Sequence, residues 1–316
     1  MTLRSLFVTG CIAALFALGA CKKSSTHDVS ADFEAALAAA EASKGSGDPA
    51  LWKLSDEDTD IYIFGTVHLL PTELQWETSA ISTAFKEANK FYMEADINSP
   101  EAAQSMMALI SELGTLPEGK SLYDMMGKED SRTLKAALEK IDLNPDMIKT
   151  FQPWYAGLTV QQFVMLKAGY NPLSGVEMVL IKRAEDQGKE FGYFETLEDQ
   201  MRILAAGDAQ EQLEGLVFTA ETIDLGTKYL DILVDEWSDG DVTGLSAIIS
   251  APEMFGSEEA YDRFLTQRNR DWIPQIEAIL DEPGQIFIAV GAAHLAGPDS
   301  VILMLENEGY TVTRVQ

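Results

Sequence analysis

Short apolar runs alternate along this chain with longer segments in which apolar residues recur at helical spacing. Residues 61–65 and 285–290 are runs of the first kind and predict buried strands. Residues 50–54 precede the first run across an acidic, turn-like stretch, so these two segments predict a hairpin. Three further strands are expected, at residues 90–93, 190–194 and 310–315. This alternation favours an α/β fold with a mainly parallel central sheet and flanking helices.

The alternation is interrupted between about residues 100 and 188, where the pattern is almost entirely helical. Helices are expected there at residues 102–112, 131–140, 151–167 and 175–187. The region is therefore predicted to be a large helical insertion that could cap the sheet. Beyond it, residues 196–206 and 210–235 look helical, and a long helix is expected at 262–280, which Pro274 should bend.

The first residues resemble a processed bacterial export signal. A basic start at Arg4 precedes an apolar segment, and Gly19-Ala20 stands directly before Cys21, which resembles a lipobox. We expect a signal peptide at 1–20, lipid attachment at Cys21 and a tether over 21–49 that contains a short helix at 30–42. The folded domain then covers 50–316. The alternative is an ordinary secretory signal that is cleaved near Ala20.

Lipidation would place the protein in the cell envelope, and Lys22 after the lipidated cysteine favours the outer membrane, facing the periplasm. Several acyl chains anchor a protein stably, whereas one binds only marginally. The formal charge of -28 argues against binding to nucleic acid or to anionic membrane surfaces. Contact with the membrane is therefore expected through the lipid only, and the oligomeric state is not predicted.

Cysteine usage limits the chemistry of the domain. Cys11 lies in the expected signal peptide and Cys21 would be acylated, so no thiol remains in the processed protein. Disulfides, a cysteine nucleophile and a thiolate metal site are thereby excluded. Any metal site must use His and carboxylate ligands.

The candidate site lies where four predicted strands end. Two Gly-x-x-His (GxxH) motifs, Gly65–His68 and Gly291–His294, follow apolar strands, whereas the third histidine, His27, lies in the tether. Glu94 and Glu195 end two more strands. Open α/β sheets place ligand sites at the carboxyl ends of their strands, and adjacent strands lie only about 4.8 Å apart. Two imidazoles and a carboxylate can hold a divalent ion, which makes bound water nucleophilic near neutral pH.

Other interpretations of the same residues stay open. A histidine after a strand is often a capping or core residue. Glu94 could face solvent, with Asp96 as its substitute, and Glu195 could instead start the next helix, where the helix dipole favours acids. Arg268 and Asn269 could hold substrate or an oxyanion, or could form a charged helix face.

An ordered set of motifs is similar to the TraB/GumN (TraB/PrgY/GumN) family, which is related to the Tiki-type metalloproteases. The matching pieces are Leu51-Trp52, the segment 65–71, Glu94, the segment 175–177, the segment 194–200, Arg268-Asn269 with Trp272, the segment 290–297, and Gly309-Tyr310. The resemblance implies an EreA/ChaN-like superfamily fold and a metal-dependent hydrolase centred on the two GxxH motifs and a glutamate. For Tiki-type members it implies peptide cleavage with manganese or cobalt. One departure is Phe194, where leucine is expected.

The sequence thus predicts an envelope-anchored, metal-dependent hydrolase that acts on peptides. His68, Glu94 and His294 would bind the ion, which could be manganese, cobalt or zinc. Glu195 would be a further ligand or the general base. Arg268 and Asn269 would hold the substrate. Two alternatives are a non-catalytic lipoprotein that binds haem, a metal or a peptide signal, and a metal-free esterase with His68 as base and Glu94 orienting it.

Overall fold

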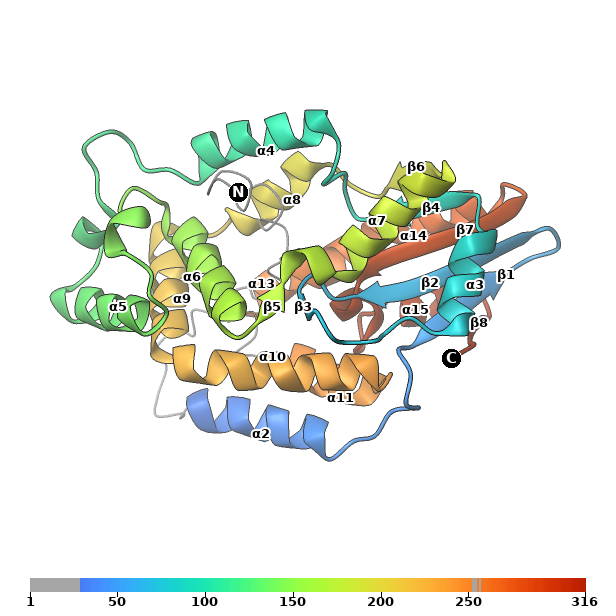
Figure 1. Ribbon diagram of the computed structural model, residues 1–316, viewed down its shortest axis with the longest axis horizontal. Helices are drawn as coiled ribbons and strands as arrows, with labels where there is room; N and C mark the ends of the chain where they lie inside the picture. Colours follow the sequence, from blue (N-terminus) through green and yellow to red (C-terminus); the bar gives the residue numbers. More distant parts are fainter. Residues whose placement is uncertain (1–28, 252–254, 256) are drawn as a thin grey trace.

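A six-stranded sheet forms the centre of the computed structural model, which describes residues 29–251, 255 and 257–316. Its strands are β1 (Leu51–Ser55), β2 (Thr59–Thr66), β4 (Lys90–Met93), β6 (Glu190–Tyr193), β7 (Gly284–Gly291) and β8 (Val312–Arg314). The spatial order is β6-β4-β7-β2-β1-β8 (Figure 1). The first four of these are mutually parallel, and β1 runs antiparallel to both β2 and β8. The predicted α/β class with a mainly parallel sheet is confirmed, as is the β1–β2 hairpin.

The register of the parallel strands brings the predicted site residues to one edge of the sheet. Gly65 of β2 pairs with Val290 of β7, so the two GxxH motifs leave neighbouring strands at nearly the same level. On the other side of β7, Met93 of β4 pairs with Ala289, and it also pairs with Tyr193 of β6. The four strand ends therefore follow one another along the edge in the order β6, β4, β7, β2.

Helices cover both faces of the sheet. Successive side chains of β7 alternate: Phe287 packs in a core with α3 (Ser79–Glu87) and α7 (Val176–Gln187), and Ile288 packs in another with α14 (Gln267–Leu280) and α15 (Val301–Asn307). Both cores are lined by large apolar side chains. Their burial supplies the main free energy that holds the helices on the sheet.

The remaining helices form a layer at the end of the molecule that the parallel strands point toward (Figure 1). They are α2 (Val29–Glu41), α4 (Pro100–Leu113), α5 (Lys128–Lys140), α6 (Pro153–Lys167), α8 (Leu197–Leu204), α9 (Ala209–Glu221), α10 (Ile223–Ser238), α11 (Val242–Ile249) and α13 (Glu258–Tyr261). Short helical turns are η1 (Leu122–Asp124), η2 (Pro145–Met147), η3 (Pro172–Ser174), the π-helical η4 (Asp262–Thr266) and η5 (Ala292–Leu295). Two-residue strands β3 (Leu70–Pro71) and β5 (Tyr170–Asn171) pair with each other. None of the helices in the described ranges is long and apolar enough to cross a membrane.

The helical layer is larger than the sequence pattern suggests. Residues 100–188 do contain the four expected helices, but α6 also packs against α9 and α10, which lie beyond residue 188. The helical prediction over 210–235 is confirmed, but it covers two helices, α9 and α10, which are separated at Thr222. There the hydroxyl group of Thr222 donates to the carbonyl oxygen of Phe218, and a new helix starts at Ile223.

The N-terminal prediction can be followed only from residue 29. The expected tether helix is α2, which packs against α10 and α11. The predicted signal peptide (1–20), Cys21 and His27 lie outside the described residues.

Candidate functional site

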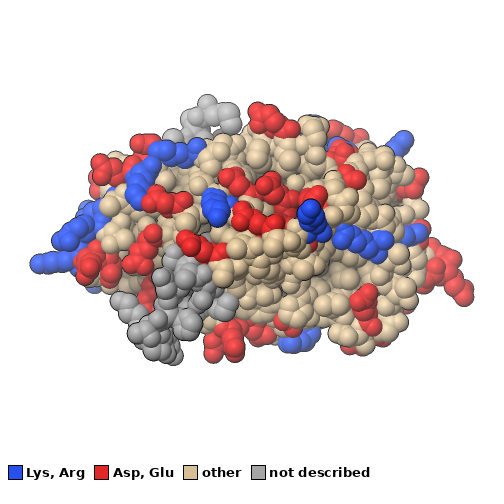
Figure 2. Space-filling model, turned by 90° about the horizontal axis from the view of Figure 1, so that it is seen from below, with Lys and Arg blue, Asp and Glu red and all other residues tan. Residues whose placement is uncertain are grey.

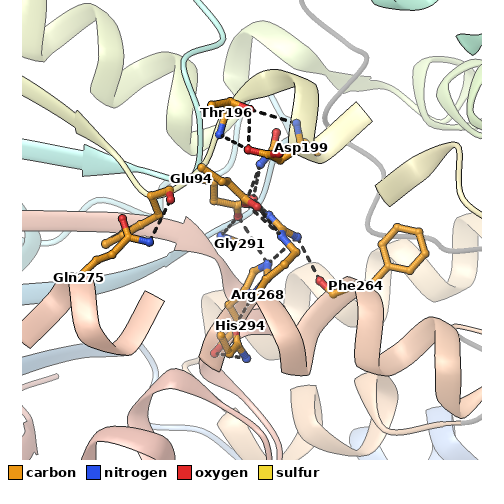
Figure 3. Close-up of polar contacts among 12 residues, drawn as sticks. Glu94, Thr196, Asp199, Phe264, Arg268, Gln275, Gly291 and His294 are labelled. Atoms are coloured by element: carbon orange, nitrogen blue, oxygen red, sulfur yellow. Dashed lines mark hydrogen bonds and ion pairs between the residues drawn. The ribbon is translucent and has the colours of Figure 1, made fainter. Parts of the chain in front are cut away.

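A buried guanidinium group joins the strand ends. Arg268 comes from the first turn of α14, and its Nη2 donates to Oε2 of Glu94 at 2.6 Å (Figure 3). Its Nε donates to both carboxylate oxygens of Glu195, at 3.0 and 3.1 Å. Its Nη1 lies 3.1 Å from the carbonyl oxygen of Phe264 and 3.1 Å from Nε2 of His294. One cation thus contacts three of the residues that the sequence placed at strand ends.

The pKa values of the two carboxylates in this cluster are shifted in opposite directions. Burial would raise the pKa of Glu94, but Arg268, the two histidines and the backbone N–H of Gly291 at 2.7 Å lower it to about 2. Burial raises the pKa of Glu195, and its contact with Arg268 offsets this only in part. Gln200 Nε2 donates to both groups, at 3.0 and 3.2 Å. Neighbouring acids whose pKa values are pushed apart are typical of a site that uses one as a fixed charge and the other for proton transfer.

His294 is fully buried and its orientation is fixed on both sides. Its Nδ1–H donates to Oδ1 of Asn269, whose Nδ2 donates to the backbone oxygen of Asp299 at 2.7 Å. The Trp272 ring packs against the imidazole at 4.4 Å between centroids. Burial and the charge of Arg268 lower the pKa of His294 to about 3, so the ring is neutral and its Nε2 lone pair points into the cluster.

His68 has the opposite charge state, because a carboxylate faces it. Its Nδ1 donates to Oε1 of Glu177 at 2.7 Å, and the hydroxyl group of Thr66 donates to the same oxygen. Burial would lower the pKa of His68, but Glu177 and then Glu94 raise it to about 9. His68 also lowers the pKa of Glu94, so it lies close enough to the cluster to share its electrostatics.

Glu177 stands in the segment 175–177 that matches the family, but the sequence does not indicate that it contacts His68. It lies in the first turn of α7 and is buried, and the backbone N–H of Val176 donates to the carbonyl oxygen of Val67. The only signal in the sequence was its place in Gly175-Val176-Glu177. Nothing there indicated which strand end the helix contacts.

Arg268 and Asn269, expected to hold substrate, both lie buried and contact other site residues. Asn269 is 1% exposed and bonds to His294 and Asp299, so it holds the His294 ring in position. Arg268 is also buried, and its N–H groups donate to other protein groups, although it borders the groove described below. Asp96, the predicted substitute for Glu94, accepts backbone N–H groups of Asn98 and Ser99 in the following turn.

The donor set fits a divalent ion in chemistry and in tautomer. Each GxxH imidazole donates through Nδ1 to an oxygen acceptor, Glu177 or Asn269, and such partners commonly fix metal-binding histidines so that Nε2 faces the ion. The positions fit less well, because Arg268 lies against Nε2 of His294. Within residues 29–251, 255 and 257–316, no three His, Cys, Asp or Glu side chains are grouped closely enough to hold a metal ion. Coordination by these donors would require the guanidinium group to move away from Nε2.

A groove of about 660 Å³ opens beside the cluster. Glu195, Arg268 and Trp272 line it, and so do Arg202, Asp262 and Arg263. Charged residues of both signs therefore border the approach to the site. The wider surface is acidic, and Figure 2 shows Asp and Glu side chains gathered in the middle of one face with Lys and Arg between and around them.

Comparison with known proteins gives one family over nearly the whole domain. A sequence model of the TraB/PrgY/gumN family matches residues 50–314. Escherichia coli "Uncharacterized protein YbaP" is 22% identical over 247 residues, which cover 77% of this chain and 87% of that protein. Human "Metalloprotease TIKI1" is 23% identical over 313 residues, and zebrafish (Danio rerio) "Metalloprotease TIKI2" is 24% identical over 305 residues. These matches cover 83% and 79% of this chain but only 61% and 57% of the two metalloproteases. No solved structure matches the chain.

Proposed function

Because the chain belongs to the TraB/PrgY/gumN family, we propose that it is a peptidase-like hydrolase of the cell envelope. The observation that carries the proposal is the cluster at the sheet edge, where the ionised Glu94, Glu195 with its raised pKa and the neutral His294 surround one guanidinium group. Relatives that bear the name metalloprotease support hydrolysis of peptides as the reaction.

The proposed roles of the site residues follow from the pKa shifts of the two carboxylates. Glu195, whose pKa is raised, is suited to accept a proton from a water that attacks the peptide carbonyl and to pass it to the leaving amine. Glu94 stays ionised and keeps Arg268 and the Gly291 N–H in place. Asn269 keeps the lone pair of His294 directed at the cluster.

A divalent ion is part of this proposal, with His68, Glu94 and His294 as its protein ligands. When bound, it would supply a Lewis acid and a water that ionises near neutral pH. Manganese, cobalt and zinc are all compatible with two imidazoles and a carboxylate.

The groove supports a peptide as substrate. Its volume of about 660 Å³ lies in the range of about 300–1,000 Å³ that is usual for ligand sites. Its charged walls offer partners for the polar backbone of an extended chain.

The envelope location rests on the N-terminal sequence. Lipid attached to Cys21 would anchor the protein, in our proposal on the periplasmic side of the outer membrane. Replacing Cys21 with Ser should move the protein from the membrane fraction to the soluble envelope fraction. A protein that stays with the membrane after this substitution contradicts lipidation.

The function is tested by incubating the purified protein with a mixture of synthetic peptides, with and without a chelator, and then restoring Mn²⁺, Co²⁺ or Zn²⁺. We expect cleavage that the chelator removes and one ion restores. His68→Gln and His294→Gln should abolish cleavage and lower the bound metal measured by elemental analysis. His27→Gln is the matched control, because His27 lies in the predicted tether and should be dispensable for both.

Each other outcome selects a different conclusion. Cleavage that resists the chelator but is lost in His68→Gln would replace the metal with the metal-free hydrolase. Capture of haem, metal or peptide without any cleavage would replace the enzyme with a binding protein. Equal metal content in all variants would remove the histidines as ligands.

A further inference from the structure

A second, apolar pocket lies beside His68 on a different side of the site from the charged groove. It has a volume of about 70 Å³, and its floor and walls come from the helical layer: Met165, Leu230, Leu233, Leu245, Ile249 and Phe255. It shares no described lining residue with the groove, which is bordered by α8, η4 and α14.

Both GxxH loops border this pocket. His68 and the two residues before it line one side, and Ala292 and Ala293, which directly precede His294, line another. The pocket therefore adjoins the site at the two GxxH loops, and the groove adjoins it at Glu195 and Arg268.

The two spaces differ sharply in polarity. The groove is bordered by seven Asp, Glu and Arg side chains, whereas no Asp, Glu, Lys or Arg appears among the described residues around the pocket. A cationic group placed in the pocket would lose its hydration without finding an ion partner there, and an anionic group would find only His68, which is already paired with Glu177; both are costly. An apolar group placed there is stabilised by the removal of its surface from water.

The volume of the pocket further limits which side chains can fit in it. An engineered cavity of about 150 Å³ in another protein binds benzene. A volume of about 70 Å³ is about half of that, which suits a branched aliphatic side chain better than an aromatic ring.

We propose that this pocket is a specificity subsite that takes an aliphatic side chain of the substrate, such as Val, Leu, Ile or Met, next to the bond that is cut. This inference rests on the proposed peptidase-like function. It adds that the residue beside the scissile bond is apolar, while the rest of the peptide extends along the charged groove.

Leu233 and Leu225 offer a matched pair of variants for the test. Both lie on α10, both are partly buried against the same core, and both can be changed to Ala, but only Leu233 lines the pocket. Their loss of stability should be similar and can be compared by thermal unfolding. Any difference in specificity between them then belongs to the pocket.

The experiment uses the lipid-free full domain with added metal ion and a peptide library in which one position carries each amino acid in turn. Cleavage sites and rates are measured by mass spectrometry. The wild-type protein should prefer aliphatic residues beside the cut bond over Asp, Lys and Gly by at least about tenfold, since about 10- to 200-fold is the discrimination that one methylene gives in an apolar pocket. Leu233→Ala should raise the rate for Phe relative to Leu by about tenfold, and Leu225→Ala should keep the wild-type ratio.

Two kinds of failure are distinguishable. If the wild-type protein cuts peptides without an aliphatic preference, or if both variants have the same specificity, the subsite is overturned and the hydrolase stands. If the wild-type protein cuts no peptide under any metal condition, the proposed function fails and the subsite fails with it.

Discussion

The two GxxH histidines occupy equivalent positions on neighbouring strands, yet their partners give them different charges. Glu177 is an anion and stabilises a protonated His68, whereas Asn269 is neutral and, together with burial and Arg268, leaves His294 unprotonated. At neutral pH and without a bound ion, the site therefore holds one imidazolium and one imidazole. The sequence motif is the same, and the difference lies entirely in which residue accepts from Nδ1.

This difference predicts the effect of Glu177→Gln. Removal of the carboxylate charge should lower the pKa of His68 from about 9, because the remaining desolvation disfavours the imidazolium ion. The titration is measured by NMR of the ring protons in metal-free protein, and the spectrum is simple since the chain has three histidines. Activity should fall by about 10- to 100-fold, as is usual for a residue that orients a ligand.

Glu185→Gln is the control for that experiment. Glu185 lies on the same helix, α7, but is exposed and bonds to Asn98. It should leave the titration of His68 unchanged. A His68 pKa that stays near 9 in Glu177→Gln would mean that Glu177 is not the source of the shift.

At the level of elements, the site depends on how two helices contact the strand ends. The first turns of α14 bring Arg268, Asn269 and Trp272 to the β4 and β7 ends. The start of α7 lies against the loop after β2, where Gly175 approaches His68 so closely that a Cβ at this position would lie 2.0 Å from the His68 backbone oxygen. A side chain of any size is therefore excluded at residue 175.

Gly175→Ala should both destabilise the protein and displace His68. The clash is with backbone, which cannot rotate away, so we expect a loss of about 2 kcal/mol or more in the free energy of unfolding and a large loss of activity. Gly226→Ala is the control. Gly226 lies inside α10, and a Cβ there would meet only Val164 of α6, at 3.6 Å. A helical Gly→Ala change should be neutral or stabilising by up to about 1 kcal/mol. Urea unfolding measures both, and equal stabilities would contradict the close contact.

Local signals explain which elements the sequence could predict. The strand ends at His68, Glu94, Glu195 and His294 were readable because each follows an apolar run, and a parallel sheet collects such ends at one edge. The contact of Glu177 with His68 joins residues more than 100 positions apart, and no local pattern encodes it. The break at Thr222 was likewise hidden, because the apolar periodicity continues across it.

The sequence also did not indicate that Arg268 lies at the centre of the cluster. An arginine in a helix next to an asparagine indicates a charged face or a substrate contact with equal ease. Only the packing of α14 against β4 and β7 shows that the guanidinium group is buried and pairs with two carboxylates at once.

In the whole molecule, the turn between α10 and α11 ties three distant parts of the chain together. Asp239 accepts the backbone N–H groups of Gly45 and Gly47, just before β1, and Arg314 of β8 donates to the carbonyl oxygen of Gly240. The helical layer is thereby fastened to both ends of the domain. Next to this turn lie two buried acids, Glu236 and Asp241.

These two acids make the global stability depend on pH. Burial and, after it, the nearby Asp241 carboxylate, which accepts from the Gly244 N–H, together raise the pKa of Glu236 to about 7. In an unfolded chain the pKa of Glu is about 4.3. Between these values the folded protein binds one more proton than the unfolded chain, so this contribution to stability is present at low pH and is lost as the pH rises through about 7.

Glu236→Gln should remove that dependence, because glutamine keeps a hydrogen-bond donor beside Asp241 and cannot ionise. The free energy of unfolding of the variant relative to the wild-type protein should therefore rise by about 1–3 kcal/mol between pH 5 and pH 8. Urea unfolding at the two pH values measures it. The exposed Glu221→Gln on α9 is the control and should show the wild-type dependence. If the two variants shift alike, the Glu236–Asp241 pair is not protonated in the folded state, and the turn that joins the helical layer to β1 and β8 carries no pH-sensitive contact.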